Sequence, residues 1–218
     1  MVVVAGLFVT LEGIDGSGKS TQARLLVQWL KGEGYQVTAT REPGGTEAGR
    51  GLRDLLLAPQ RALTPEAELF LYLADRAIHI VEVVRSSLAR GQIVVCERHA
   101  DSTLAYQGYG RGLDLEVLRR LNNLATGGLT PDLSLVLDIP AAAARLDAAR
   151  LDRLESEGEE FMARVAAGFR DLARAEPERM KLVNGSAEVV AVQAEIRGLV
   201  RRLLDSRPHP KTGGREGQ

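Results

Sequence analysis

The chain has 218 residues, of which 44% are hydrophobic and 26% are charged, and its net charge is −1. This length suits one α/β domain with a large core, and the balanced charge predicts neither a nucleic-acid nor a membrane partner. No apolar run approaches the length of a membrane span, the first residues lack a signal-peptide pattern, and the lone Cys96 fits a reducing compartment, so we expect a cytoplasmic protein in which Cys96 is a small buried hydrophobe.

The predicted elements alternate between strands and helices. Apolar runs predict strands at 7–11, 36–40, 93–96, 133–139 and 180–183. Helical patterns cover 21–30, 46–57, 64–89, 114–125, 157–175 and 188–204, and Pro140 opens a further short helix. Because the strands are apolar on both faces, we predict an α/β three-layer sandwich in which helices cover both faces of a five-stranded parallel sheet. We expect residues 1–205 to form a single domain and residues 206–218 to be a disordered tail.

A phosphate-binding loop lies between the first strand and the first helix. The segment fits the pattern G-x-x-x-x-G-K-[ST], and its residues are Gly13-Ile14-Asp15-Gly16-Ser17-Gly18-Lys19-Ser20. The glycines let backbone N–H groups and the helix N-terminus face a polyphosphate. In such a loop Lys19 reaches the β- and γ-phosphates and the Ser20 hydroxyl can bind Mg²⁺. The segment therefore predicts a nucleotide triphosphate site.

Arginines at loop positions narrow the function of that site. The chain lacks the Asn-Lys-x-Asp element that reads guanine in GTPases, but it carries Arg41, Arg76, Arg98, Arg111 and the group Arg145, Arg150 and Arg153 outside its regular helix faces. An enzyme that moves a phosphoryl group between two phosphorylated molecules must offset several negative charges. Arginine does so with a planar fork that binds phosphate bidentately. The pattern favours a kinase.

Several separated motifs resemble the bacterial thymidylate kinases, which phosphorylate dTMP with ATP. The resemblance spans about residues 7–204. It rests on the phosphate-binding loop and on two characteristic segments, Arg41-Glu42-Pro43-Gly44-Gly45-Thr46 and Asp101-Ser102-Thr103-Leu104-Ala105-Tyr106-Gln107-Gly108. It implies a P-loop kinase fold, ATP and Mg²⁺ as donor and metal, dTMP as acceptor, and a homodimer formed through helices that carry Ile78, Ile80, Val83 and Val84.

The resemblance also implies roles for individual residues. Asp15 meets the acceptor sugar or the phosphates with their Mg²⁺, Glu97 joins Ser20 at the metal, Arg98 clamps the acceptor phosphate and Arg41 lies near it. Tyr72 stacks on thymine where the family usually has Phe, and Arg76, one helical turn later, binds a thymine carbonyl. Ser102, Tyr106 and Gln107 complete the deoxynucleoside pocket.

A short lid, about residues 145–156, completes the site that the resemblance implies. Members with Gly after the loop aspartate, as at Gly16, carry the catalytic arginine in the lid. Arg150 and Arg153 are therefore expected to meet the γ-phosphoryl group, and Arg145 to flank the adenine. The chain departs from the usual Asp-Arg-Tyr or Asp-Arg-Phe with Glu97-Arg98-His99. We expect His99 to be a packing substitute.

Two other functions fit parts of the pattern. Another nucleoside monophosphate kinase, preferring dUMP or dCMP, would keep the loop and the lid but change the pocket around Tyr72, Arg76 and Tyr106. A nucleotide-gated binding protein would have no acceptor at all. A panel of acceptors and the dependence of ADP formation on dTMP separate these alternatives.

Overall fold

A parallel sheet forms the centre of the molecule. The computed structural model describes residues 6–60, 62–145, 151–207 and 209. Five strands pair in the order β2-β3-β1-β4-β5, and every pairing is parallel. The strands are β1 (Leu7–Glu12), β2 (Val37–Arg41), β3 (Ile93–Glu97), β4 (Leu133–Asp138) and β5 (Met180–Asn184). The predicted α/β class and all five predicted strands are confirmed.

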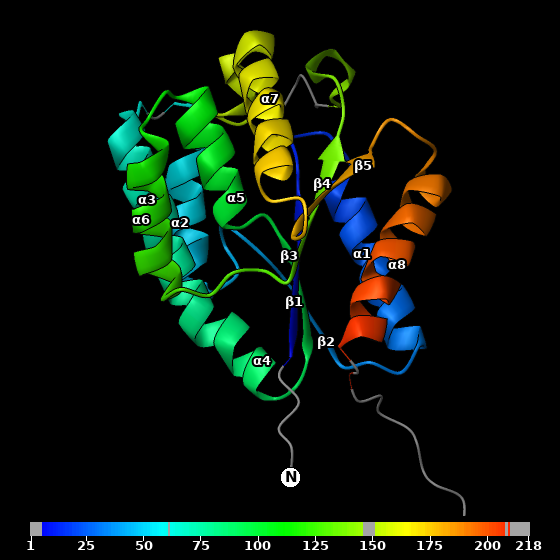
Figure 1. Cartoon of the computed structure of the whole chain (residues 1–218). Helices are drawn as coiled ribbons and strands as arrows, with labels where there is room; N and C mark the ends of the chain where they lie inside the picture. The colour runs from blue at the N-terminus through cyan, green and yellow to red at the C-terminus, as the bar shows by residue number, and fades with distance from the viewer. Residues whose placement is uncertain (1–5, 61, 146–150, 208, 210–218) are drawn as a thin grey trace, which may run out of the picture.

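Helices cover both faces of this sheet (Figure 1). Two of them, α1 (Lys19–Gly32) and α8 (Val189–Ser206), lie on one face and share a core with it, in which Leu26, Leu30 and Ile196 are fully buried. The other face carries α2 (Glu47–Leu57), α3 (Pro65–His79), α6 (Leu115–Thr126) and α7 (Glu159–Ala175). Each face of the sheet thus has its own apolar core. Each large aliphatic side chain that is buried there stabilises the fold by about 1.5–3 kcal/mol.

One long helical stretch begins at Pro65, where the Thr64 side chain accepts a hydrogen bond from the Ala67 N–H (3.2 Å). It continues as predicted to Ala89, but through a π-helical segment, Ile80–Arg85, and the short α4 (Ser86–Ala89).

The wider turns of that π-helical segment direct two side chains into the core. Ile80 and Val84 are 1% and 0% exposed and pack with Phe8 and Val94 of the sheet. The prediction that Ile80 and Val84 form a subunit interface is therefore wrong: both are used by the molecule's own core. Ile78 and Val83 are half-buried.

A second helical stretch was not predicted. It consists of α5 (Ala100–Thr103) and a π-helical segment, Leu104–Gly110, that packs against α7. Its glycines lower helix propensity, yet they allow close contact. A Cβ atom on Gly110 would lie 2.7 Å from the Phe161 ring, and one on Gly108 would lie 2.4 Å from the Leu115 side chain.

The lid region differs from the expected short helix. Pro140 precedes a single 3₁₀ turn, Ala141–Ala143, and a second 3₁₀ turn, Glu155–Glu157, leads into α7. Arg150 lies outside the described residues. Helix α8 ends one residue into the predicted tail, at Ser206, and most of that tail also lies outside the described residues. Among the described residues, no helix has both the length and the apolar character that crossing a membrane requires.

Candidate active site

The phosphate-binding loop connects β1 to α1 through backbone conformations that glycine provides. Gly13, Gly16 and Gly18 have φ values of 129°, 73° and 95°, and Gly18 is the N-cap residue that precedes α1. A side chain on Gly16 would collide with the backbone of Arg145, because its Cβ would lie 2.4 Å from that nitrogen. The loop therefore needs glycine both for its turn and for the close approach of the segment that carries Arg145.

Lys19 lies in the first turn of α1, and its ammonium group points back into the loop. The Nζ atom donates to the Ile14 carbonyl (2.7 Å) and to Ser17 Oγ (3.5 Å). Burial and the nearby Arg98 charge lower the pKa of Lys19 to about 7, although Asp15 and Glu12 act in the opposite direction. The charged form of Lys19 is therefore disfavoured in the free protein, and a bound anion would stabilise it. Ile14 contributes its carbonyl to this contact, while its side chain is buried in the core.

Two oxygen ligands meet beside the loop. The Ser20 hydroxyl donates to Glu97 Oε2 over 2.5 Å, although the two residues come from α1 and from the end of β3. Both line the same cavity as Lys19. Hydroxyl and carboxylate oxygens are the ligand types that Mg²⁺ prefers, so the donor set fits the predicted metal.

Arg98 follows β3 directly and has a backbone conformation that is rare for a side-chain-bearing residue, with φ of 67°. This conformation turns the guanidinium toward the phosphate-binding loop. Its Nη1 donates to the Gly13 carbonyl (2.9 Å) and to Ser102 Oγ (3.3 Å), and its Nη2 donates to Asp15 Oδ1 (2.5 Å) and to the Tyr106 hydroxyl (3.1 Å).

Asp15 and Tyr106 complete this polar cluster. The Tyr106 hydroxyl donates to Asp15 Oδ2 (2.8 Å), and the Arg98 guanidinium lies 4.9 Å from the centre of the Tyr106 ring. Burial alone would raise the pKa of Asp15, but the charges of Arg98 and Lys19 lower it to about 2. Asp15 is therefore an anion at neutral pH, bound to Arg98, the cation that the family resemblance places at the acceptor phosphate.

A second cavity opens on the far side of Arg98. Tyr72 and Arg76, one turn apart on α3, both line it, as the spacing predicts. Ser102, Tyr106 and Gln107 line it as well, and Gln107 Nε2 donates to Glu68 Oε1 (2.7 Å). Burial raises the pKa of the Tyr72 hydroxyl, so its ring stays neutral.

The two cavities share a wall. The cavity at the phosphate-binding loop, of about 380 Å³, is lined by Lys19, Ser20, Arg41, Glu97 and Arg145 among others. Of the described residues, four line both cavities: Asp15, Glu42, Arg53 and Arg98. Because Asp15 and Arg98 stand at the junction, a group in one cavity can meet a group in the other there.

Among the described residues that were expected to meet the γ-phosphoryl group, Arg153 is one that the structure does not bring to this junction. Its Nη1 forms an ion pair with Glu68 Oε2 (2.6 Å), and its Nε donates to the Leu56 carbonyl (2.9 Å). Arg153 therefore joins the lid region to α2 and α3 and does not line the phosphate cavity. Arg150 and Arg153 are close together in the chain, so the sequence alone does not show that Arg153 forms an ion pair with a carboxylate.

Two buried glutamates that the sequence pattern does not single out organise the arginines. Glu68 binds Gln107, Arg111 and Arg153 at once. Glu42 binds Arg76 and lies inside the motif Arg41–Thr46, where its role could have been suspected only from the motif. Cys96, by contrast, is confirmed as a buried core residue whose thiol pKa is raised by burial.

Transfer of a phosphoryl group between two nucleotides requires an anion-binding loop beside a separate pocket with its own arginines. This arrangement defines the class of P-loop nucleoside monophosphate kinases. Similarity to known proteins identifies the family within that class. The family model described as thymidylate kinase matches residues 11–196. A thymidylate kinase of Synechococcus sp. (strain JA-2-3B'a(2-13)) is 51% identical over 210 residues, which cover 96% of this chain and all of that protein.

Further similarity is found in a second relative and in a solved structure. A thymidylate kinase of Exiguobacterium sp. (strain ATCC BAA-1283 / AT1b) is 46% identical and covers 88% of this chain and 93% of its own length. The crystal structure of thymidylate kinase from Ehrlichia chaffeensis superimposes with a TM-score of 0.76 at 34% identity, covering 90% of this chain and 99% of that one. The chain belongs to the thymidylate kinase family.

Proposed function

We propose that this chain transfers the γ-phosphoryl group of ATP to dTMP at the junction of the two cavities, giving dTDP and ADP. ATP-dependent dTMP phosphorylation is the activity of the family. The observation that carries the assignment of sites is the shared wall: Asp15 and Arg98 line both the phosphate-loop cavity and the aromatic cavity. A donor in the first cavity and an acceptor in the second bring their phosphates together there.

The donor phosphates occupy the loop in this proposal. Gly16, Gly18 and the start of α1 present backbone N–H groups, and the ammonium of Lys19 exchanges its carbonyl contact for phosphate oxygens. Arg145, whose backbone N–H donates to the Gly16 carbonyl (3.4 Å), covers the loop from the side assigned to the adenine.

Ser20 and Glu97 are the residues that would hold Mg²⁺. Their oxygens already lie together, and Glu97 keeps the carboxylate that the family usually provides as Asp. When bound, the ion neutralises charge on the β- and γ-phosphates.

The acceptor chemistry needs positioning and charge more than proton transfer. The second pKa of a phosphate monoester is about 6, so the acceptor is mostly a dianion at neutral pH and needs no general base. In the structure Asp15 supplies the anionic partner of Arg98. A dTMP phosphate takes over part of that partnership, while Tyr106 packs beneath the sugar and leaves little room for a 2′-hydroxyl group.

The thymine base lies between Tyr72 and Arg76 in this proposal. The hydrogen bonds of Arg76 use Nε and Nη1, which leaves Nη2 to donate to a base carbonyl. Arg41, exposed at the end of β2, faces the same phosphate region. Arg150 is our choice for the arginine at the transferring group, because the contacts of Arg153 already serve Glu68 and Leu56.

We further propose a homodimer and a cytoplasmic location. The packed helices α3 and α6, with the π-helical segment after α3, expose Phe70 (60%), Val81 (67%), Val117 (51%) and Leu124 (78%). Large exposed apolar side chains on neighbouring elements mark protein interfaces, so these residues replace Ile80 and Val84 as the interface. The buried thiol of Cys96 suits a reducing compartment.

An acceptor panel tests this function. ADP formation from ATP should require a nucleoside monophosphate, and dTMP should give a higher kcat/KM than dUMP or dCMP. ADP formation at the same rate without dTMP would overturn the proposal in favour of a nucleotide-gated protein. Arg150→Ala should lower kcat on the order of 10³-fold with little change in the Kd for dTMP; a change in that Kd alone would remove Arg150 from the transfer step.

A further inference from the structure

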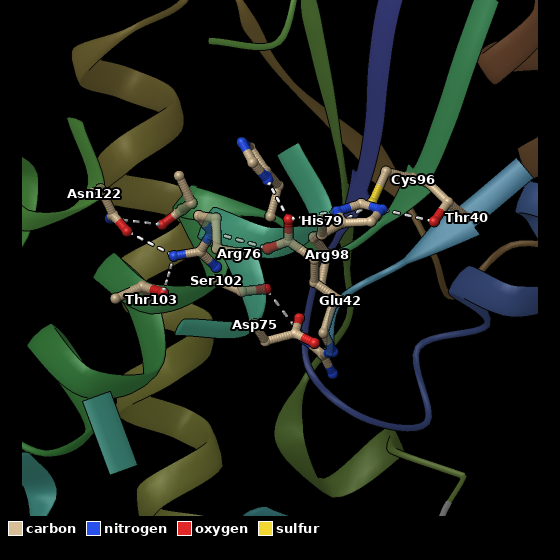
Figure 2. A network of polar contacts seen from close by, with 12 residues as sticks. Thr40, Glu42, Asp75, Arg76, His79, Cys96, Arg98, Ser102, Thr103 and Asn122 are labelled. Atoms are coloured by element: carbon tan, nitrogen blue, oxygen red, sulfur yellow. Dashed lines mark hydrogen bonds and ion pairs between the residues drawn. The ribbon is translucent and has the colours of Figure 1, made fainter. Parts of the chain in front are cut away.

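Glu42 lies at the centre of a buried cluster (Figure 2), of which the proposed function uses only Arg76. Its Oε2 atom accepts a hydrogen bond from Arg76 Nε (2.8 Å). Its Oε1 atom contacts His79 Nδ1 (2.8 Å) and His99 Nδ1 (2.9 Å). Glu42 and Arg76 are 4% and 2% exposed, and both histidines are 0% exposed. The four side chains come from the end of β2, from α3 and from the residue that follows Arg98.

The donors in this cluster are fixed by the carboxylate. Burial would raise the pKa of Glu42, but His99, Arg76 and the hydrogen bonds from both histidines hold it well below its usual range. An ionised carboxylate only accepts, so Nδ1 carries the proton in both rings. The two histidines thus occupy Oε1 together, and Oε2 is left to Arg76 alone.

The remaining contacts of Arg76 are both made by one guanidinium nitrogen, Nη1. Nη1 donates to Thr103 Oγ1 (2.8 Å) and to Asn122 Oδ1 (2.6 Å), which come from α5 and α6. Glu42 provides the contact at Nε and is the only carboxylate in an ion pair with Arg76 among the described residues. With Nε and Nη1 occupied, the direction of Nη2 in the base cavity depends on where Glu42 stands.

The contact between His99 and Glu42 leaves the other ring nitrogen of His99 without a hydrogen-bond partner in the part of the chain that the structure describes. Its Nε2 atom is buried and has no partner among the described residues, and its ring packs edge-on against Phe8 (5.0 Å between centroids). A phenyl ring at this position would keep the packing and avoid the unpartnered nitrogen. The Nδ1–H donor to Glu42 is therefore the property that distinguishes histidine here from a packing substitute.

We propose that Glu42, fixed by His79 and His99, is a positioning residue that aims Arg76 Nη2 at the 4-position of the pyrimidine, so that the site accepts a carbonyl and rejects an amino group there. The inference rests on the proposed role of Arg76 at the base. It also links the two ends of the acceptor site, because His99 follows Arg98 in the chain and bonds the carboxylate that holds Arg76.

A comparison of dTMP with 5-methyl-dCMP tests this role. The two acceptors share the methyl group and the 2-carbonyl group. They differ at N3, which carries a proton only in thymine, and at the 4-position, where the amino group of 5-methyl-dCMP opposes the Arg76 donor. The measured quantity is the ratio of kcat/KM for dTMP to that for 5-methyl-dCMP. Glu42→Gln, which keeps the shape but puts a donor into the cluster, should lower this ratio on the order of 10-fold or more.

Variants of His99 separate positioning from packing. His99→Phe should lower the same ratio roughly 3-fold while the folded protein keeps its Tm, because the packing remains and His79 still holds Glu42. His99→Asn should restore the ratio, because its amide places a donor where Nδ1 lies. Asp75→Asn is the matched control: Asp75 is a buried carboxylate near Glu42 that accepts from the Gly44 N–H (3.0 Å) and makes no hydrogen bond to Arg76. It should leave the ratio unchanged.

Arg76→Ala separates failure of this inference from failure of the base assignment. If Arg76→Ala leaves the ratio at the wild-type value, Arg76 does not read the base and the proposed function of that residue fails. If Arg76→Ala removes the selectivity but a folded Glu42→Gln keeps it, the positioning role of Glu42 is overturned. Should Glu42→Gln not fold, an unchanged ratio in His99→Phe, or an equal loss in Asp75→Asn, overturns it in the same way.

Discussion

Nucleotide binding should draw a proton onto Lys19. In the free protein, burial and the charge of Arg98 lower the pKa of this lysine from 10.5 to about 7. That change corresponds to on the order of 5 kcal/mol against the charged form. A phosphate charge about 4 Å away contributes roughly 4 kcal/mol at an effective dielectric constant near 20. Two or more phosphate charges therefore return the pKa toward its ordinary value.

The expected proton uptake follows from these values. At pH 8 a group with a pKa of about 7 is roughly one-tenth protonated, so binding takes up about 0.9 proton for each nucleotide. At pH 6 Lys19 is already about nine-tenths protonated, and its uptake falls to about 0.1 proton. The difference between the two values of pH identifies the titrating group as one with a pKa between them.

Isothermal titration calorimetry with ADP measures this uptake. Titrations at pH 8 in buffers of different ionisation enthalpy give the number of protons bound, and ADP avoids turnover. Lys31→Met, which removes an exposed lysine from the same helix, is the control and should retain the uptake. If binding at pH 8 takes up no proton, or if Lys31→Met abolishes the uptake, the reasoning about Lys19 is refuted.

Three further changes test other parts of the site. Glu97→Gln should raise the Mg²⁺ concentration for half-maximal activity about 10-fold, because it weakens one of two oxygen ligands; an unchanged Mg²⁺ titration would count against the site. Leu124→Asp, on the face exposed by α6, should halve the mass measured by light scattering while the fold remains, and an unaltered mass would exclude this face. Burial and Asp101 raise the pKa of Glu12 from 4.5 to about 7. Between these two pH values the folded protein binds more protons than the unfolded protein. The free energy of unfolding therefore falls as the pH rises through 7. Glu12→Gln should therefore gain up to about 3 kcal/mol over wild type between pH 5 and pH 8 in thermal unfolding, whereas a constant difference would show that Glu12 does not titrate there.

Features set by local pattern could be predicted from the sequence. The inner strands β1, β3 and β4 are mostly apolar and buried, whereas the edge strands β2 and β5 also carry polar residues. The start of α3 is set by Thr64 and Pro65, which are adjacent in the chain. The phosphate-binding loop is a contiguous motif, and Tyr72 and Arg76 share a cavity because four residues make about one helical turn.

Features that depend on distant contacts could not be predicted. The helical stretch over 100–110 was not predicted: its glycines lower helix propensity, and the ring and aliphatic side chain that they contact come from other segments. Ile80 and Val84 appeared available for an interface because the sequence does not show the π-helical segment that turns them onto Phe8 and Val94. Glu42 and His79 are 37 residues apart, so the cluster around Arg76 is visible only in the folded molecule.

In our proposal, donor and acceptor phosphates meet where Asp15 and Arg98 line both cavities. The most direct test is a crystal structure with a bisubstrate analogue in which adenosine and thymidine are joined by a chain of phosphates. We expect adenosine on the side of Arg145, thymine between Tyr72 and Arg76, and the connecting phosphates in contact with both Lys19 and Arg98. A complex in which the phosphates near thymidine lie away from Arg98 would contradict this proposal.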